Sequence, residues 1–191
     1  MPFQNSNGFN NQNNSQGGEK KKTNFPVGRL FGSDGVMNVS IWNSDSAVYT
    51  IFSIKQAVGK DPSTGANVYE QKMPNELPRV FLNPEFLRAF LESAKKVDMN
   101  AGGFSVSPKH GTKVTVATSN SQVKITLESE KGSRTISLEP IPVGTTNVNG
   151  AWKNLVELLD VAMKKALYAK LDPEEFAAAL GASSAEEELP I

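Results

Sequence analysis

The hydrophobic pattern changes its period along the chain, and the order of these changes constrains the fold most. Between residues 28 and 73, four segments alternate apolar and polar side chains with the period of two that is typical of β-strands. Residues 82–97 then follow helical spacing, four more alternating segments occupy residues 103–140, and a second helical pattern covers residues 151–171. The sequence therefore predicts an α+β fold in which two four-stranded antiparallel sheets are each followed by a helix.

The first helix has clear start signals and a continuous apolar stripe. Asn83 is a good N-cap and Pro84 suits the first helical position. A third, short helix is predicted from Asp172 to Gly181. Buried positions are expected at Phe31, Phe81 and Phe104, and along the two helical stripes, Phe86, Leu87, Phe90, Leu91 and Ala94 in the first helix and Leu155, Val156, Leu159, Ala162, Met163, Ala166 and Leu167 in the second.

This order of strands and helices resembles the Whirly fold, whose relatives include the single-strand-binding transcriptional coactivators. The resemblance covers residues 27–181 and is one of topology, because the lysine-rich strand motif of that family is missing here. It implies two packed sheets with helices behind them and a C-terminal helix-loop-helix that assembles homo-oligomers. An oligonucleotide-binding (OB) barrel with appended helices is the alternative, although that fold needs about five strands rather than eight.

Aromatic residues on the polar faces of strands suggest a ligand surface. Trp42 shares the polar face of its strand with Asn38 and Ser40, and a structural role in a gap between sheets or subunits is the alternative for this ring. Bases stack on aromatic rings at about 1–3 kcal/mol each whatever their sequence, while lysines contact the phosphates. The candidate nucleic-acid-binding residues are Trp42, Tyr49, Lys55, Tyr69, Lys113 and Lys124.

Charge and composition divide the chain into three parts. Residues 1–24 are rich in Asn, Gln and Gly and are predicted to be a disordered arm, followed by a binding domain over 25–181. All 20 Lys and Arg but only 14 of the 20 Asp and Glu precede residue 172, so this part has a formal charge of +6. The six remaining acids give residues 172–191 a charge of −6, and residues 182–191 are predicted to be a partner-binding tail.

The last six residues, EEELPI, resemble the C-terminal tip of bacterial and phage single-stranded-DNA-binding proteins. In that family an acidic run, an apolar residue, a proline and a terminal aromatic residue dock into basic pockets of replication and repair proteins. The terminal isoleucine is a departure, because the family usually ends in phenylalanine. The resemblance implies that the partner-binding residues are Glu186, Glu187, Glu188, Leu189, Pro190 and Ile191.

Residues suited to catalysis are scarce. The chain has no cysteine, and its one histidine, His110, lies in a turn, where a solvated role is the usual one. Neither a secretory signal nor a membrane-spanning stretch is evident. We expect no enzymatic activity, no cofactor and no metal, and a cytoplasmic location in a bacterium or phage-infected cell.

These patterns predict a homo-oligomeric single-stranded-DNA-binding protein of phage or bacterial replication, recombination or repair. Single-stranded DNA is the expected partner, RNA is the alternative ligand, and replication or recombination proteins would bind the tail. A structural or virion protein with an all-β body, and a transcriptional regulator that binds DNA, are the alternatives from other functional classes.

Overall fold

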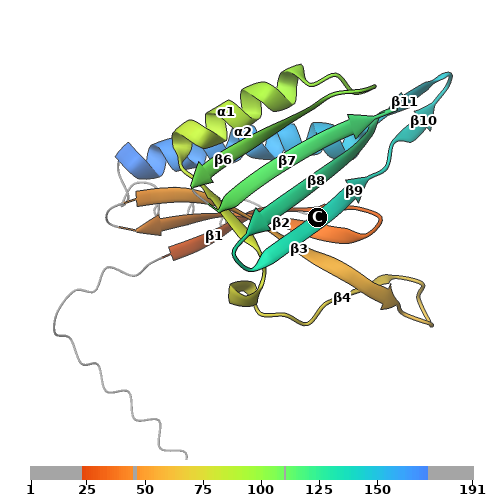
Figure 1. Ribbon diagram of the computed structural model, residues 1–191, viewed down its shortest axis with the longest axis horizontal. Coiled ribbons are helices and arrows are strands. Elements are labelled where there is room, and N and C mark those ends of the chain that lie inside the picture. The colour runs from red at the N-terminus through yellow and green to blue at the C-terminus, as the bar shows by residue number, and fades with distance from the viewer. Residues whose placement is uncertain (1–22, 45–46, 110, 172–191) are drawn as a thin grey trace, which may run out of the picture.

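The computed structural model describes residues 23–44, 47–109 and 111–171 (Figure 1). The predictions made for His110, for a third helix at residues 172–181, for the acidic tail and for nearly all of the N-terminal arm lie outside these described residues.

The first sheet is antiparallel and has five strands. They are β1 (Thr23–Phe31), β2 (Gly35–Ser44), β3 (Ala47–Lys60), β4 (Asn67–Tyr69) and β5 (Arg79–Leu82). β1, β2, β3 and β4 are neighbours in that order, and β5 pairs with β3 on a stretch that β4 leaves free. The four strands predicted before the first helix are all present, but β5 adds a fifth, unpredicted strand between the short 3-10 helix η1 (Pro74–Glu76) and that helix.

The second sheet has the predicted four antiparallel strands. β6 (Gly103–Lys109), β7 (Thr112–Ser119), β8 (Gln122–Ser129) and β9 (Gly132–Leu138) are neighbours in chain order. A separate hairpin of β10 (Ile141–Val143) and β11 (Thr146–Val148) follows, in a segment that the sequence did not predict as strands. Within the described part of the chain these strands form no closed barrel, so the barrel alternative is not observed.

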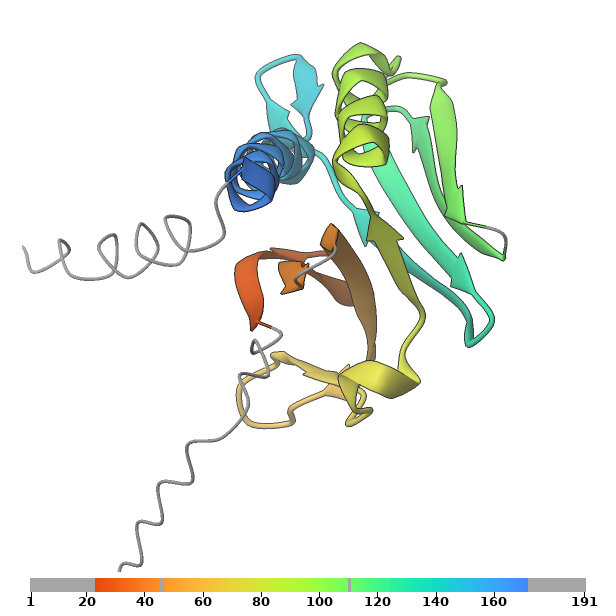
Figure 2. The same cartoon turned by 90° about the vertical axis from the view of Figure 1, so that its left-hand side faces the viewer.

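Both helices lie on one side of the molecule, with the first sheet curving beneath them (Figure 2). α1 (Pro84–Lys96) begins as predicted, with the side chain of Asn83 accepting a hydrogen bond from Phe86 N at 2.9 Å. α2 (Gly150–Leu171) starts beside Asn149, whose Oδ1 accepts from Trp152 N while its Nδ2 donates to the carbonyl oxygen of Leu138. That amide therefore fixes the start of α2 to the end of β9.

One apolar core lies between the two sheets and the two helices. It includes the expected stripe of α1 and, from α2, the side chains of Leu155, Leu159, Ala162 and Ala166. Leu155 and Leu159 are fully buried in this core. Phe104 packs against the core as predicted, but Phe31 was wrongly placed there, because its side chain is 61% exposed at the end of β1.

Polar contacts also join the two sheets. The carboxylate of Asp34, in the turn between β1 and β2, accepts hydrogen bonds from Ser137 N at 2.7 Å and Ser137 Oγ at 2.8 Å. Glu70, next to β4, forms an ion pair of 3.3 Å with Arg134 on β9. Burial alone would raise the pKa of Glu70, but the hydrogen bond from Gln56 N and the Arg134 guanidinium outweigh it and lower the pKa below its ordinary value.

Candidate nucleic-acid interface

The outer face of the first sheet, the one turned away from the core, collects polar, aromatic and basic side chains. On β2, Met37, Val39 and Ile41 are buried, while the alternating residues Asn38, Ser40 and Trp42 are partly exposed. The same alternation on β3 points Tyr49, Ser53 and Lys55 outward. The period of two therefore places Trp42, Tyr49 and Lys55 on one surface, as the sequence indicated.

Three aromatic rings form a row at one end of this face. Trp42 and Tyr49 are directly paired across β2 and β3, and their rings stack with centroids 5.8 Å apart and an interplanar angle of 23°. The Tyr49 ring meets Phe81 of β5 edge to face at 6.2 Å. Arg79, two residues before Phe81, lies over the Phe81 ring with its guanidinium carbon 5.4 Å from the centroid. The row is thus a continuous aromatic surface with a cation at its end.

The sequence prediction for Phe81 was wrong, since its side chain is partly exposed on the outer face while Val80 and Leu82 are buried. The strand β5 was missed because it has only four residues and leads directly into the cap of α1. The segment Arg79–Leu82 has one polar residue followed by three apolar ones, so the sequence shows no alternation there and only the burial does.

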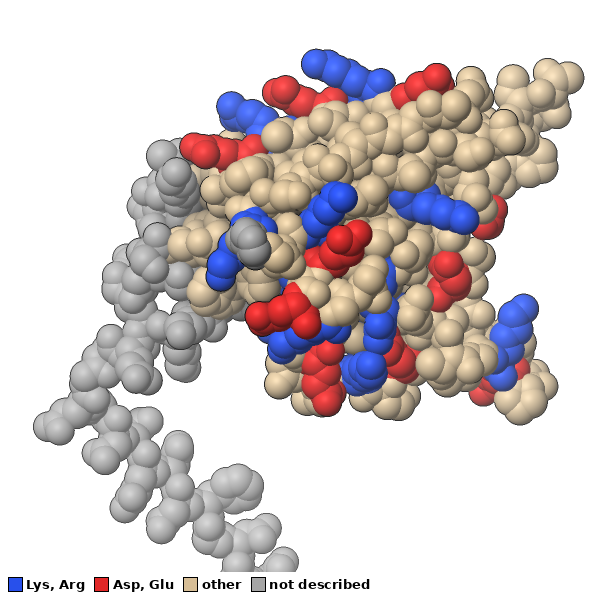
Figure 3. All heavy atoms as spheres, in the orientation of Figure 1, with Lys and Arg blue, Asp and Glu red and all other residues tan. Residues whose placement is uncertain are grey.

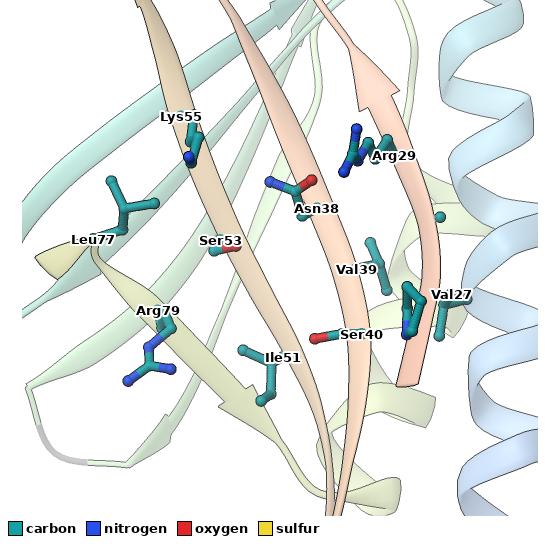
Figure 4. A pocket seen from close by; sticks show the side chains of 12 residues that line it. Val27, Arg29, Asn38, Val39, Ser40, Ile51, Ser53, Lys55, Leu77 and Arg79 are labelled. Carbon is teal, nitrogen blue, oxygen red and sulfur yellow. The ribbon is translucent and has the colours of Figure 1, made fainter. Parts of the chain in front are cut away.

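A hollow of about 510 Å³ lies beside the aromatic row on the same face (Figure 4). Register places Arg29 of β1, Asn38, Ser53 and Arg79 of β5 side by side across four strands. Lys55 lines the hollow from β3. All of the lining residues lie in the described part of the chain, and none of them is acidic. The hollow therefore presents three cations and several hydrogen-bonding side chains without a compensating carboxylate.

An irregularity in β1 brings Arg29 onto this face. The pairing of β1 with β2 shifts between Pro26 and Gly28, so that one extra residue, Val27, is inserted as a bulge. After the bulge, Arg29 is the partner of Asn38. Arg29 lies on this face only because of the bulge, so the sequence pattern alone did not identify the residue.

The other predicted site residues lie outside the aromatic row and the hollow. Tyr69 pairs with Ala57, which is two residues along β3 from Lys55 but eight from Tyr49, or about 26 Å from the row at ~3.3 Å per residue. Lys113 and Lys124 lie on the outer face of the second sheet, where Lys113 is paired with Glu128. The structure thus pairs Trp42 with Tyr49, places Lys55 farther along the same face in the adjoining hollow, and adds Phe81, Arg29 and Arg79.

The excess of positive charge is a local property of the hollow. On the side of the molecule shown in Figure 3, basic and acidic side chains are interspersed over the surface. Among the described residues, no group of three or more His, Asp or Glu side chains could hold a metal ion. Concentrated positive charge next to stacked rings can bind a polyanion that also carries flat, unpaired bases.

Comparisons with protein-family models, with curated proteins and with solved structures return no match for this chain. In the part of the chain that the structure describes, no helix is long and apolar enough to cross a membrane.

Proposed function

We propose that this protein binds single-stranded DNA without sequence preference, through the outer face of its first sheet. The observation that carries the proposal is the aromatic row Trp42–Tyr49–Phe81 next to a hollow lined by Arg29, Lys55 and Arg79. Bases would stack on the rings, and the three cations would neutralise phosphates. The flat faces of the bases are accessible in a single strand and hidden in a duplex, so the surface favours the former.

The role in a cell belongs to the same proposal. Two antiparallel sheets with helices on one side support a Whirly-like arrangement, although the five-stranded first sheet departs from it. The acidic tip at residues 186–191 supports recruitment of replication, recombination or repair proteins, and a homo-oligomer is the proposed assembly.

A fluorescence titration tests the proposal. The full-length protein is titrated with oligo-dT and with duplex of equal length, at 50 and 200 mM salt. We expect tighter binding of the single strand, strong weakening at the higher salt, and quenching of tryptophan emission. Trp152 is the internal reference, because this residue is only 5% exposed and belongs to the core.

Two substitutions at Trp42 separate stacking from other causes of quenching. Trp42→Phe retains an aromatic ring and should bind oligo-dT within about threefold of the parent while losing most of the quenching. Trp42→Ala removes the ring and should weaken binding about tenfold, which corresponds to stacking of one base at ~1.4 kcal/mol. Equal affinity for duplex and single strand, with no change in emission, would refute the proposed function.

A further inference from the structure

We infer that the bound strand continues from the first sheet onto the turn ends of the second, where Lys109 and Lys131 form a second phosphate-binding subsite. This inference rests on the proposed function and extends it to a defined path for the strand. The path leaves the hollow at Arg79, crosses Phe81 and reaches the turns that follow β6 and β8.

Three adjoining hollows define the path. The hollow on the first sheet shares Leu77 and Arg79 with a second hollow of about 510 Å³, which is also lined by Phe81, Lys109 and Lys131. A third hollow, of about 410 Å³, shares Phe81 and Lys109 with the second and includes Tyr49 of the aromatic row. Tyr49, Phe81 and the two lysines therefore line a series of adjoining hollows.

The position of β5 explains why this series of hollows continues from the first sheet to the second. β5 is hydrogen-bonded to β3 of the first sheet and also lies against β7 and β8 of the second. Its outward residues Arg79 and Phe81 are consequently shared by both surfaces. A chain that follows the aromatic row past β5 meets the ends of β6 and β8 next.

Charge favours a polyanion along this route. Arg79, Lys109 and Lys131 contribute three positive charges to the second hollow, and Glu130 is the one acid among its lining residues, all of which are described. Lys131 Nζ donates a hydrogen bond to the carbonyl oxygen of Asn75, which holds the ammonium group beside η1 without neutralising it. The net charge of the second hollow is therefore positive.

The dimensions give the length of DNA that each part holds. Four adjacent strands at about 4.8 Å spacing make the first hollow ~14 Å wide, room for about five stacked nucleotides, since they are joined by four steps of ~3.4 Å. An oligonucleotide of five residues therefore fits on the first sheet alone. A longer one must use the second subsite.

The test compares two lysine pairs on two oligonucleotides. The Lys109→Ala/Lys131→Ala variant should bind dT15 about 25-fold more weakly than the parent at 0.1 M salt, with the salt slope reduced by about 1.4, since each lost phosphate contact contributes ~0.7 to the slope. Binding of dT5 should stay within about twofold. The matched control Lys113→Ala/Lys124→Ala removes the same charge from the outer face of the second sheet and should leave both affinities within about threefold.

A charge-retaining variant and the two oligonucleotide lengths distinguish failure of the second subsite from failure of the proposed function. Lys109→Arg/Lys131→Arg should bind dT15 like the parent, and circular dichroism with a thermal melt checks that every variant is folded. If the parent binds both lengths but the Lys109/Lys131 double alanine variant binds dT15 equally well, the second subsite is refuted and the first remains. The inference is also refuted if the Lys113/Lys124 pair has the larger effect. If the parent binds neither length, the proposed function itself fails.

Discussion

The two sheets are built alike on the inside and differently on the outside. Both bury alternating Val, Ile, Leu and Phe side chains in the common core. On the outer face of the second sheet, register aligns a row of small hydroxyl residues, Ser105, Thr115, Thr126 and Thr135. The corresponding face of the first sheet has three aromatic rings, two arginines and a lysine.

This difference distinguishes side chains that suit the outer face of any strand from side chains that suit a ligand. Threonine suits the solvent face of a strand, because its branched side chain has a high β propensity and its hydroxyl group remains hydrated or paired. The aromatic and arginine side chains on the outer face of the first sheet are not part of the core cluster, which lies on the opposite face. The outer face of the first sheet is therefore the one that we propose as the ligand surface.

The largest effect on binding is expected from removing the positive charges on the outer face of the first sheet. Arg29→Ala/Lys55→Ala/Arg79→Ala should weaken binding of oligo-dT about 100-fold at 0.1 M salt and reduce the salt slope by about 2, because three phosphate contacts of ~0.7 each are lost. Lys113→Ala/Lys124→Ala should change the affinity by less than about threefold. Filter binding over a salt series measures both, and similar losses in the two variants would remove the distinction between the sheets.

Removing a ring from the first sheet should have the next largest effect. Tyr49 contacts both Trp42 and Phe81, so Tyr49→Ala interrupts the aromatic row at its centre. We expect about tenfold weaker binding of oligo-dT, consistent with the loss of one stacked base. Tyr49→Phe retains the ring and should bind like the parent in the same assay; a tenfold loss there would point to the hydroxyl group instead of stacking.

Much of the fold follows from local pattern. The alternation identified eight strands, and Asn83 and Pro84 located the start of α1 correctly, because capping and periodicity act over a few residues. The strand β5 was missed because four residues are too few for a clear period. Its pairing with the middle of β3 is a long-range contact that the pattern does not encode.

The candidate site was predictable only in part, for the same physical reason. The period of two gives the face of Trp42 and Tyr49 within their own strands. It does not say how the outer faces of the two predicted sheets lie relative to each other, so Lys113 and Lys124 of the second sheet were grouped with residues of the first. Arg29 depends on a bulge, and Phe81 on an unpredicted strand, so both required the three-dimensional register.

The connection between the sheets can be tested at Asp34. Asp34→Ala leaves Ser137 N and Ser137 Oγ without the carboxylate that accepts their hydrogen bonds. The free energy of unfolding should fall by about 1–3 kcal/mol, measured by urea denaturation. Asp34→Asn retains one acceptor oxygen and should lose less, and a loss as large as that of the alanine variant would contradict the role of these hydrogen bonds.

The second connection, between Glu70 and Arg134, should depend on pH. The pKa of Glu70 is lowered in the folded protein, so its ionised form stabilises the fold above the unfolded-state pKa of about 4.3, and this contribution is lost as the pH falls through the folded-state pKa. Glu70→Gln should therefore unfold about 1 kcal/mol more easily at pH 7 and match the parent in strong acid. Urea denaturation from pH 7 to pH 3 tests this, and a constant difference across the range would contradict it.

The smallest expected effect lies within the threonine row and has the opposite sign. The hydroxyl groups of Thr126 and Thr135 are hydrogen-bonded to each other at 2.9 Å, whereas Thr115 Oγ1 is buried without a hydrogen-bond partner among the described residues. Thr115→Val keeps the shape of the side chain and removes the unpaired polar atom, so the free energy of unfolding should rise by about 0.5 kcal/mol. Thr126→Val breaks the Thr126–Thr135 hydrogen bond and should lower it by about 1 kcal/mol. Both variants should bind oligo-dT like the parent, because the row belongs to the sheet whose outer face serves stability; a loss of binding in either would show that the second sheet contacts the strand over its whole width.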